Sequence, residues 1–186
     1  MVEKAEKGIE LSNPMPLPGN MDAVASGWDR WHDAADRNDD KNLKSFIIKS
    51  SNEGALKSLI DGVFGNSPFL SHTLINDWEF THQVFEDGPR SAFDGIIKTV
   101  SDPMLITEDQ ASIMKVLRIA RRRCAFAIAL ADLTGQWPLT EIIESLSKFA
   151  EASISAAVSH LLHYGQKTGE IELSDPSQPS RDSGFI

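Results

Sequence analysis

The 186-residue sequence has little of what several common protein classes require. It has one cysteine, Cys124, which rules out an intrachain disulfide. No apolar run reaches the roughly 18 residues that a membrane-spanning helix needs, and the N-terminus has no apolar signal segment. With 18 Lys and Arg against 27 Asp and Glu, the net charge is -9. Because an acidic surface repels polyanions, we expect a cytoplasmic protein that binds neither nucleic acid nor a membrane.

The common catalytic motifs are missing as well. No serine is flanked by glycines as in a hydrolase elbow, and the glycines stand singly rather than in a phosphate-binding loop. No strand carries two aspartates one residue apart, where nucleotide-transferring enzymes usually bind their metal. From its residues alone, the chain is predicted to be a helical domain with no catalytic, cofactor-binding or metal-binding residue of its own.

Two residue types that often form sites, histidine and cysteine, have simpler explanations here. His160 and His163 are three residues apart on one predicted helix, but a zinc site needs at least a third ligand and none is near. We expect both to be surface or helix-capping histidines. Cys124 lies in an apolar helical run and is expected to be a small buried apolar side chain rather than a reactive thiol.

One stretch partly matches a calcium-binding loop. Asp36, Asn38 and Asp40 occupy the first, third and fifth positions of such a loop. The sharp turn at position six needs glycine and the last ligand at position twelve is glutamate, whereas these positions hold Lys41 and Ile47. A solvated turn that caps the following helix is the better interpretation.

Apolar residues recur with helical spacing over most of the chain, and nothing between residues 41 and 169 alternates as a strand would. Glycine, proline and hydroxyl residues mark the ends of the helices. The short GQWP connection predicts that the last two helices are long and antiparallel, in an all-α bundle of about six helices. The sequence predicts a helix over residues 21–38 and a helix that ends at Gly65. Further helices are predicted to start at Ser67-Pro68, at Gly88-Pro89, at a capping box of Thr107 and Gln110, and at Pro138. The last helix is predicted to end at Gly165 or Gly169.

The organisation along the chain follows from composition. Residues 1–20 contain three prolines in a polar setting and are predicted to be an extended or disordered arm. Residues 21–169 form the helical domain. Residues 170–186 have the composition of a linker, which ends in Phe185 and Ile186, two residue types typical of a strand.

The one basic cluster is the strongest candidate for a contact site. Arg118, Arg121 and Arg122 share a helix face at spacings of three and four, and together they can hold a phosphate or carboxylate group. In an acidic protein such arginines also pair with acidic side chains of neighbouring helices. Both interpretations stay open.

Three separated blocks resemble one known family: VFGNSPFLSHTLINDWEF, LRIARRRCAFAIALADLTGQWPL and EIIESLSKFAEASISAAVSHLL. In this order and spacing they are similar to the N-terminal helical region of the bacterial glutamine synthetase adenylyltransferase and adenylyl-removing enzyme, over roughly residues 50 to 186. One departure is Trp78, where members of the family commonly have proline after the aspartate aligned with Asp77.

The resemblance implies a bifunctional nucleotidyltransferase that attaches AMP to a tyrosine of glutamine synthetase and removes it by phosphorolysis. It implies that residues 170–186 lead into the first strand of a nucleotidyltransferase domain that this chain does not include. Mg²⁺ is expected only for the full-length enzyme, and the expected partners are glutamine synthetase, the PII signal protein and the missing domain. By itself this part is predicted to be inactive.

Two other functions compete with that interpretation. The chain can be an autonomous all-α interaction module whose two long helices form a binding surface. A weaker alternative is the ligand-binding domain of a regulator, although no basic helix-turn-helix is evident in the sequence.

Overall fold

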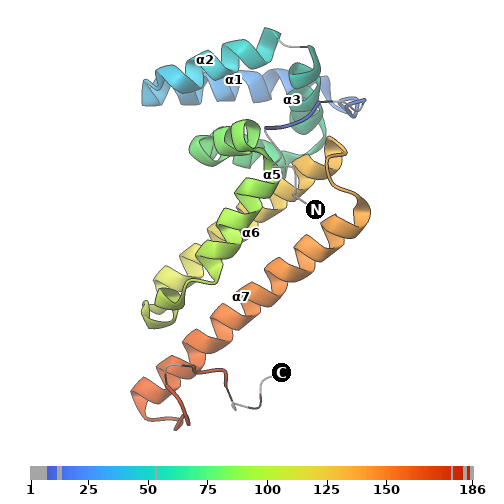
Figure 1. Ribbon diagram of the computed structural model, residues 1–186. Coiled ribbons are helices and arrows are strands. Elements are labelled where there is room, and N and C mark those ends of the chain that lie inside the picture. The colour runs from blue at the N-terminus through green and yellow to red at the C-terminus, as the bar shows by residue number, and fades with distance from the viewer. Residues whose placement is uncertain (1–7, 12–13, 53, 177, 182–183, 185–186) are drawn as a thin grey trace. The chain divides into compact units, whose positions relative to one another are not determined.

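The computed structural model describes residues 8–11, 14–52, 54–176, 178–181 and 184 (Figure 1). These residues contain helices and connections but no strand, which confirms the all-α prediction. Phe185 and Ile186, the predicted start of a strand, lie outside the described residues. The elements are α1 (Met21–Asn38), α2 (Lys41–Asn52), α3 (Gly54–Asn66), α4 (Pro68–Asn76), α5 (Trp78–Val100), the 3-10 helix η1 (Pro103–Thr107), α6 (Gln110–Leu133) and α7 (Leu139–Thr168).

The chain divides into two compact units. Unit 1 comprises Met1–Ala92 and Phe126–Leu139, and unit 2 comprises Phe93–Ala125 and Thr140–Ile186. Helices α5 and α6 therefore each contribute to both units. The domain boundaries expected near residues 20 and 170 stay predictions.

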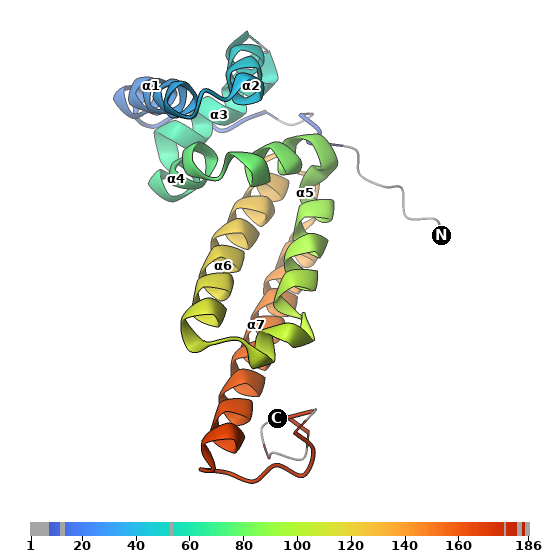
Figure 2. The ribbon, with the colours of Figure 1, turned by 90° about the vertical axis from the view of Figure 1, so that its left-hand side faces the viewer.

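Unit 1 is built around an aromatic cluster on its first three helices. Trp31 of α1 is fully buried and meets Phe46 of α2 and Phe64 of α3 edge to face, with ring centroids 6.0 and 6.1 Å apart. Such tilted ring pairs add to the free energy of apolar burial. Trp28 packs beside them and donates a 2.7 Å hydrogen bond from Nε1 to Asp61. The three helices lie together in Figure 2.

The described part of residues 8–20 has no helix and packs within unit 1. The Ile9 amide donates to the Phe85 carbonyl at 3.1 Å. Further along, the Asn66 side chain accepts from the Gly19 amide at 2.8 Å and donates to the Leu17 carbonyl at 3.0 Å. Backbone groups of an arm with no secondary structure are satisfied in this way by side chains and turns.

Most of the predicted helix boundaries agree with the structure. Ser67 caps α4, accepting from the Leu70 amide at 3.2 Å, and Pro68 follows as the first helical residue. Gly88 has φ 87° and ψ 161°, so the helix breaks there and restarts at Pro89. Helix α6 ends just before Gly135, and α7 ends at Thr168, one residue before Gly169.

The predicted calcium-like stretch is a capping turn, as expected. The carboxylate of Asp40 accepts from the amides of Asn42 and Leu43 at 2.9 and 3.0 Å, and so caps α2. Asp36 pairs with Lys44 at 3.2 Å rather than turning toward Asp40.

The predicted capping box of Thr107 and Gln110 is wrong. The Thr107 hydroxyl donates back to the Met104 carbonyl at 3.0 Å, because Thr107 is the last residue of η1. Asp109 caps α6 in its place: its carboxylate accepts from the Ser112 amide and the Ser112 hydroxyl, both at 2.9 Å. These two hydrogen bonds lower the pKa of the Asp109 carboxyl, and the bond from the Ser112 amide has the larger effect.

Unit 2 confirms the two long antiparallel helices. Within this unit, residues 110–125 of α6 run beside α7 and in the opposite direction (Figures 1 and 2). Phe93 and Ile96 of α5 are buried, as are Ile113 and Ala120 of α6. The Lys148 ammonium of α7 lies 5.9 Å from the Phe93 ring centroid, within cation–π range.

Candidate functional site: a basic face on α6

The part of α6 in unit 2 concentrates positive charge. Between residues 110 and 125 it carries one lysine and four arginines and no acidic residue, in a chain whose net charge is -9. A local potential of the opposite sign to the whole molecule is what selects an anionic group on a partner.

The structure shows which of these cations reach solvent. Lys115, Arg118 and Arg121 are exposed, whereas Arg122 and Arg123 are half-buried and have interactions within the chain. Helical spacing puts Lys115, Arg118, Arg121 and Arg122 on one side of α6, which we call the basic face. The three arginines predicted from the sequence therefore share a face, and two of them are exposed.

The opposite side of α6 holds the basic face in place. Ile113, Ala120 and Cys124 are buried there, and burial raises the pKa of the Cys124 thiol to about 12. The thiol is thus held protonated near neutral pH, and Cys124 is buried, as expected from the sequence. A small apolar hollow of about 130 Å³ lies beside it between α5 and α6, lined by Ile96, Thr99, Val116, Ile119, Ala120 and Arg123.

The two histidines of α7 have no third candidate metal ligand near them among the described residues. His160 Nδ1 lies 3.3 Å from the Ile106 carbonyl oxygen, which links α7 to the last turn of η1. With 5% of its surface exposed, His160 is buried rather than on the surface, so that expectation is wrong for this residue because η1 covers it. Across the part of the chain that the structure describes, no three His, Cys, Asp or Glu side chains group as metal ligands would.

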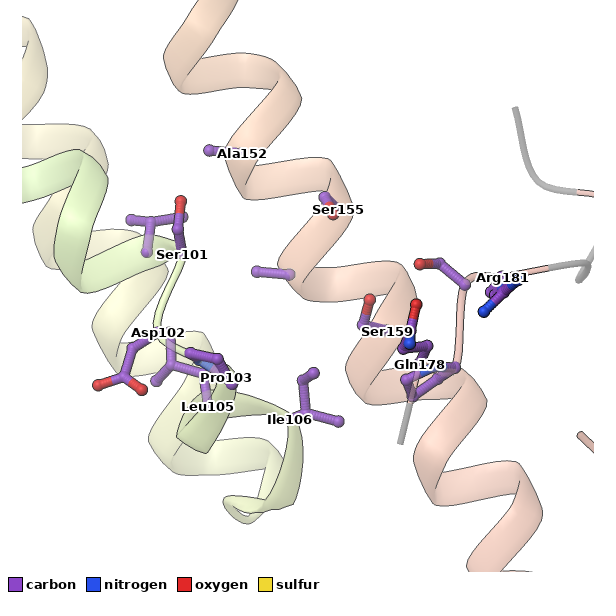
Figure 3. A pocket seen from close by; sticks show the side chains of 14 residues that line it. Ser101, Asp102, Pro103, Leu105, Ile106, Ala152, Ser155, Ser159, Gln178 and Arg181 are labelled. Carbon is purple, nitrogen blue, oxygen red and sulfur yellow. The ribbon is translucent and has the colours of Figure 1, made fainter. Parts of the chain in front are cut away.

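A second candidate is a hollow of about 360 Å³ in unit 2 (Figure 3). One wall is η1 with the residues before it, another is a row of small residues on α7, and Gln178–Arg181 lies across the opening. Its polar groups include the hydroxyls of Ser155 and Ser159. The Asp102 carboxylate at its edge already caps η1 through the Met104 amide at 2.9 Å. The described lining of the hollow thus offers hydroxyl, amide and guanidinium groups that can bind a ligand.

Sequence reasoning missed an open hollow of about 650 Å³ in unit 1, between α2 and the first half of α5. Part of its wall is aromatic: Trp78 meets His82 edge to face at a centroid distance of 4.8 Å, and it meets Phe46 at a tilt at 5.2 Å. Trp78 is the first residue of α5, a position that has no need of an intrahelical amide hydrogen bond. Proline and tryptophan are therefore both compatible with the helix at this position.

Comparison with known proteins gives the class of protein first. The matches are to adenylyltransferases, and the matching region includes all of α4 to α7, most of α3 and the non-helical residues that follow α7. The chain belongs to the family described as glutamate-ammonia ligase adenylyltransferase, whose model matches residues 56–181. This confirms the resemblance found in the sequence.

The curated relatives are all much longer than this chain. A bifunctional glutamine synthetase adenylyltransferase/adenylyl-removing enzyme of Rhizobium meliloti is 34% identical over 141 residues, which cover 73% of this chain and 14% of the relative. The protein of the same description from Agrobacterium fabrum is 31% identical over 138 residues, 72% of this chain and 14% of the relative. No solved structure matches the chain. The chain thus spans about one seventh of these relatives.

Within the described residues, none of the helices has both the length and the apolar character that crossing a bilayer requires.

Proposed function

We propose that this chain is the N-terminal helical region of a bifunctional enzyme that attaches AMP to glutamine synthetase and removes it by phosphorolysis. Family membership over residues 56–181 supports this proposal, and so does the activity that the names of these relatives describe. In the removal reaction, an oxygen of inorganic phosphate attacks the phosphorus of the AMP group and forms ADP. The bond between that phosphorus and the tyrosine oxygen breaks. The tyrosine oxygen then carries a proton.

The basic face of α6 is the observation that points to a specific binding site. An adenylylated tyrosine has a phosphodiester, which keeps one negative charge at neutral pH. The exposed guanidinium groups of Arg118 and Arg121 are suited to hold such a group, because arginine donates two parallel hydrogen bonds to phosphate oxygens. The role that we assign to the basic face is to bind and orient the modified subunit, while bond breaking takes place elsewhere in the full enzyme.

The remaining features of the whole enzyme are proposals that rest on the family. The described residues have no group of side chains that fits a metal ion, so we place Mg²⁺ outside this region and assign it no step here. PII signal proteins and a nucleotidyltransferase domain are the other proposed partners, and the cytoplasm is the proposed location.

The proposal is tested by measuring binding of this chain to glutamine synthetase in its adenylylated and unmodified forms. We expect tighter binding of the adenylylated form, with an affinity that falls as salt rises, because a charged contact is screened by ions. Free AMP added as a competitor should weaken that preference. Equal binding of both forms, or no binding of either, would contradict the proposed role.

The alternative of an autonomous interaction module is favoured by a different observation, the apolar outer side of α7 described below.

A further inference from the structure

Helix α7 has a continuous apolar stripe on its solvent side. Five large apolar side chains along it are exposed by 49% to 64%: Ile143, Leu146, Ile154, Leu161 and Tyr164. Ala150 and Ala157 lie between them at the same helical spacing. Successive members are three or four residues apart, so all seven fall on one side of the helix. We call this side the α7 stripe.

The buried positions of the same helix hold little large apolar surface. Its five buried residues are Ile142, Ser145, Ser159, His160 and Gly165, and only Ile142 has a large apolar side chain. In a surface helix the large apolar residues ordinarily face the protein and the polar ones face water. On α7 five large apolar side chains face water instead, which indicates that the stripe is covered by something outside the chain.

We infer that the α7 stripe binds the same stripe of a second copy of this chain, with the two helices antiparallel. The first reason is the order of side-chain sizes along the stripe. Outward from Ile154 the stripe runs small, large, large in both directions: through Ala150, Leu146 and Ile143 one way and through Ala157, Leu161 and Tyr164 the other. A two-fold axis next to Ile154 therefore pairs small with small and large with large.

The second reason is the area that the pairing removes from water. The exposed fractions of the five large residues correspond to about 600 Å² of accessible surface on one copy, most of it apolar, near the upper end for a patch on a stable monomer. If all of this surface is covered, two copies together bury at most on the order of 1,200 Å², which is the lower end of the range for specific interfaces.

The third reason is charge. The first half of α7, residues 139–153, carries Glu141, Glu144 and Glu151 with one lysine, whereas residues 154–168 carry Lys167 and no acidic residue. Antiparallel pairing places the acidic half of one helix against the basic half of the other, and it also opposes the two helix dipoles. Parallel pairing would bring the acidic halves together. This inference does not depend on the proposed function.

The proposed dimer is tested by measuring the molecular mass of the purified chain in solution by sedimentation or light scattering. The chain concentration is raised to about 100 µM. We expect a dimer of the 20.5 kDa chain. The double substitution Ile154→Glu with Leu161→Glu introduces four charges into the paired interface and should weaken the dimer at least about 100-fold. Ile48→Glu is the matched control, because Ile48 of α2 is exposed by 58% and lies off the stripe.

The antiparallel orientation of the two helices is tested by disulfide cross-linking of variants that each have one added cysteine. The native Cys124 is buried and does not interfere. Antiparallel pairing predicts that Ile154→Cys forms a disulfide with its own copy. It also predicts that a mixture of Ile143→Cys and Tyr164→Cys chains cross-links between the two variants and not within either.

A chain that stays monomeric throughout the concentration range would overturn the inference. So would a dimer that loses as much affinity with Ile48→Glu as with the double substitution. Cross-linking of Ile143→Cys chains to each other would overturn the antiparallel arrangement. Circular dichroism of each variant checks that the helices are retained, which is expected because the substituted side chains are exposed.

Discussion

At the scale of single residues, the cap of α6 links stability to pH. The folded state lowers the pKa of the Asp109 carboxyl, chiefly through the Ser112 amide and then the Ser112 hydroxyl. A carboxyl with a lowered pKa stabilises the folded state above its unfolded pKa, near 3.8, and that stability is lost as the pH falls through the folded value. The contribution is therefore present at pH 7 and disappears in acid below about pH 4.

We predict that Asp109→Asn removes this part of the pH dependence. Asparagine also caps helices well but has no charge to lose, so the difference in unfolding free energy between the variant and the wild type should shrink from pH 7 to pH 3. Urea unfolding at the two pH values measures it, with Glu172→Gln on an exposed residue as the control. If the difference in unfolding free energy between the two proteins stays the same or grows at pH 3, the Asp109 charge is not what stabilises the cap.

The start of α6 shows what local sequence patterns could not predict. Thr107 with Gln110 fits the pattern of a capping box, and Asp109 with Ser112 also places a capping side chain three residues before a partner. The short 3-10 helix decides between them because it includes Thr107 and uses its hydroxyl. Ser67-Pro68 had no such competitor, and its prediction is confirmed.

At the scale of elements, the contact between α1 and α3 depends on a residue with no side chain. A Cβ at Gly27 would overlap the ring of Phe64, which is itself held between Trp28 and Trp31. The glycine is therefore needed for the close approach of the two helices, even though glycine is a poor helix former.

We predict that Gly27→Ala destabilises unit 1 by about 1–3 kcal/mol, because the added methyl group would push against the buried Phe64 ring, which is packed on Trp28 and Trp31. Gly95→Ala is the control: a Cβ there meets nothing within 4 Å, so the higher helix propensity of alanine should stabilise by roughly 0.5–1 kcal/mol. Thermal or urea unfolding gives both values. If Gly27→Ala stabilised the protein as Gly95→Ala should, the packing account of α1 and α3 would be wrong.

Helix α7 shows what periodicity leaves undetermined. The spacing of Leu146, Phe149, Ala150 and Leu161 predicts a helix, and the helix is there. The same spacing gives no information on which side meets the rest of the protein. Leu146 and Leu161 are exposed while Ser145 and Ser159 are buried, because the buried side is chosen by the shape of η1 and the neighbouring helices.

At the scale of the whole molecule, the shared face of the three arginines could be predicted from spacing alone. Their exposure could not, because it depends on which residues of other elements approach α6. Arg122 is half-buried and Arg118 is exposed, although both belong to the same face. The division into two units was also beyond the sequence, since α5 and α6 each cross from one unit to the other without an obvious linker.

We predict that the purified chain catalyses neither reaction. Nucleotidyl transfer of this kind depends on metal held by carboxylates, and the described residues present no such group. The assay is release of ADP from adenylylated glutamine synthetase with phosphate and Mg²⁺, with the full-length Rhizobium meliloti relative as the positive control. Magnesium-dependent ADP release by the chain itself would refute the prediction.

The most direct test of the account is charge reversal of the basic face. Arg118→Glu, Arg121→Glu and Arg122→Glu together should weaken binding of adenylylated glutamine synthetase by tenfold or more, about 1.4 kcal/mol, because the bound phosphodiester loses its donors and meets carboxylates. The matched control reverses three exposed charges of unit 1, Arg30, Arg37 and Lys41, and changes the net charge equally. We predict a loss of affinity for the first variant only, and unchanged binding by a variant that is still folded would contradict the account.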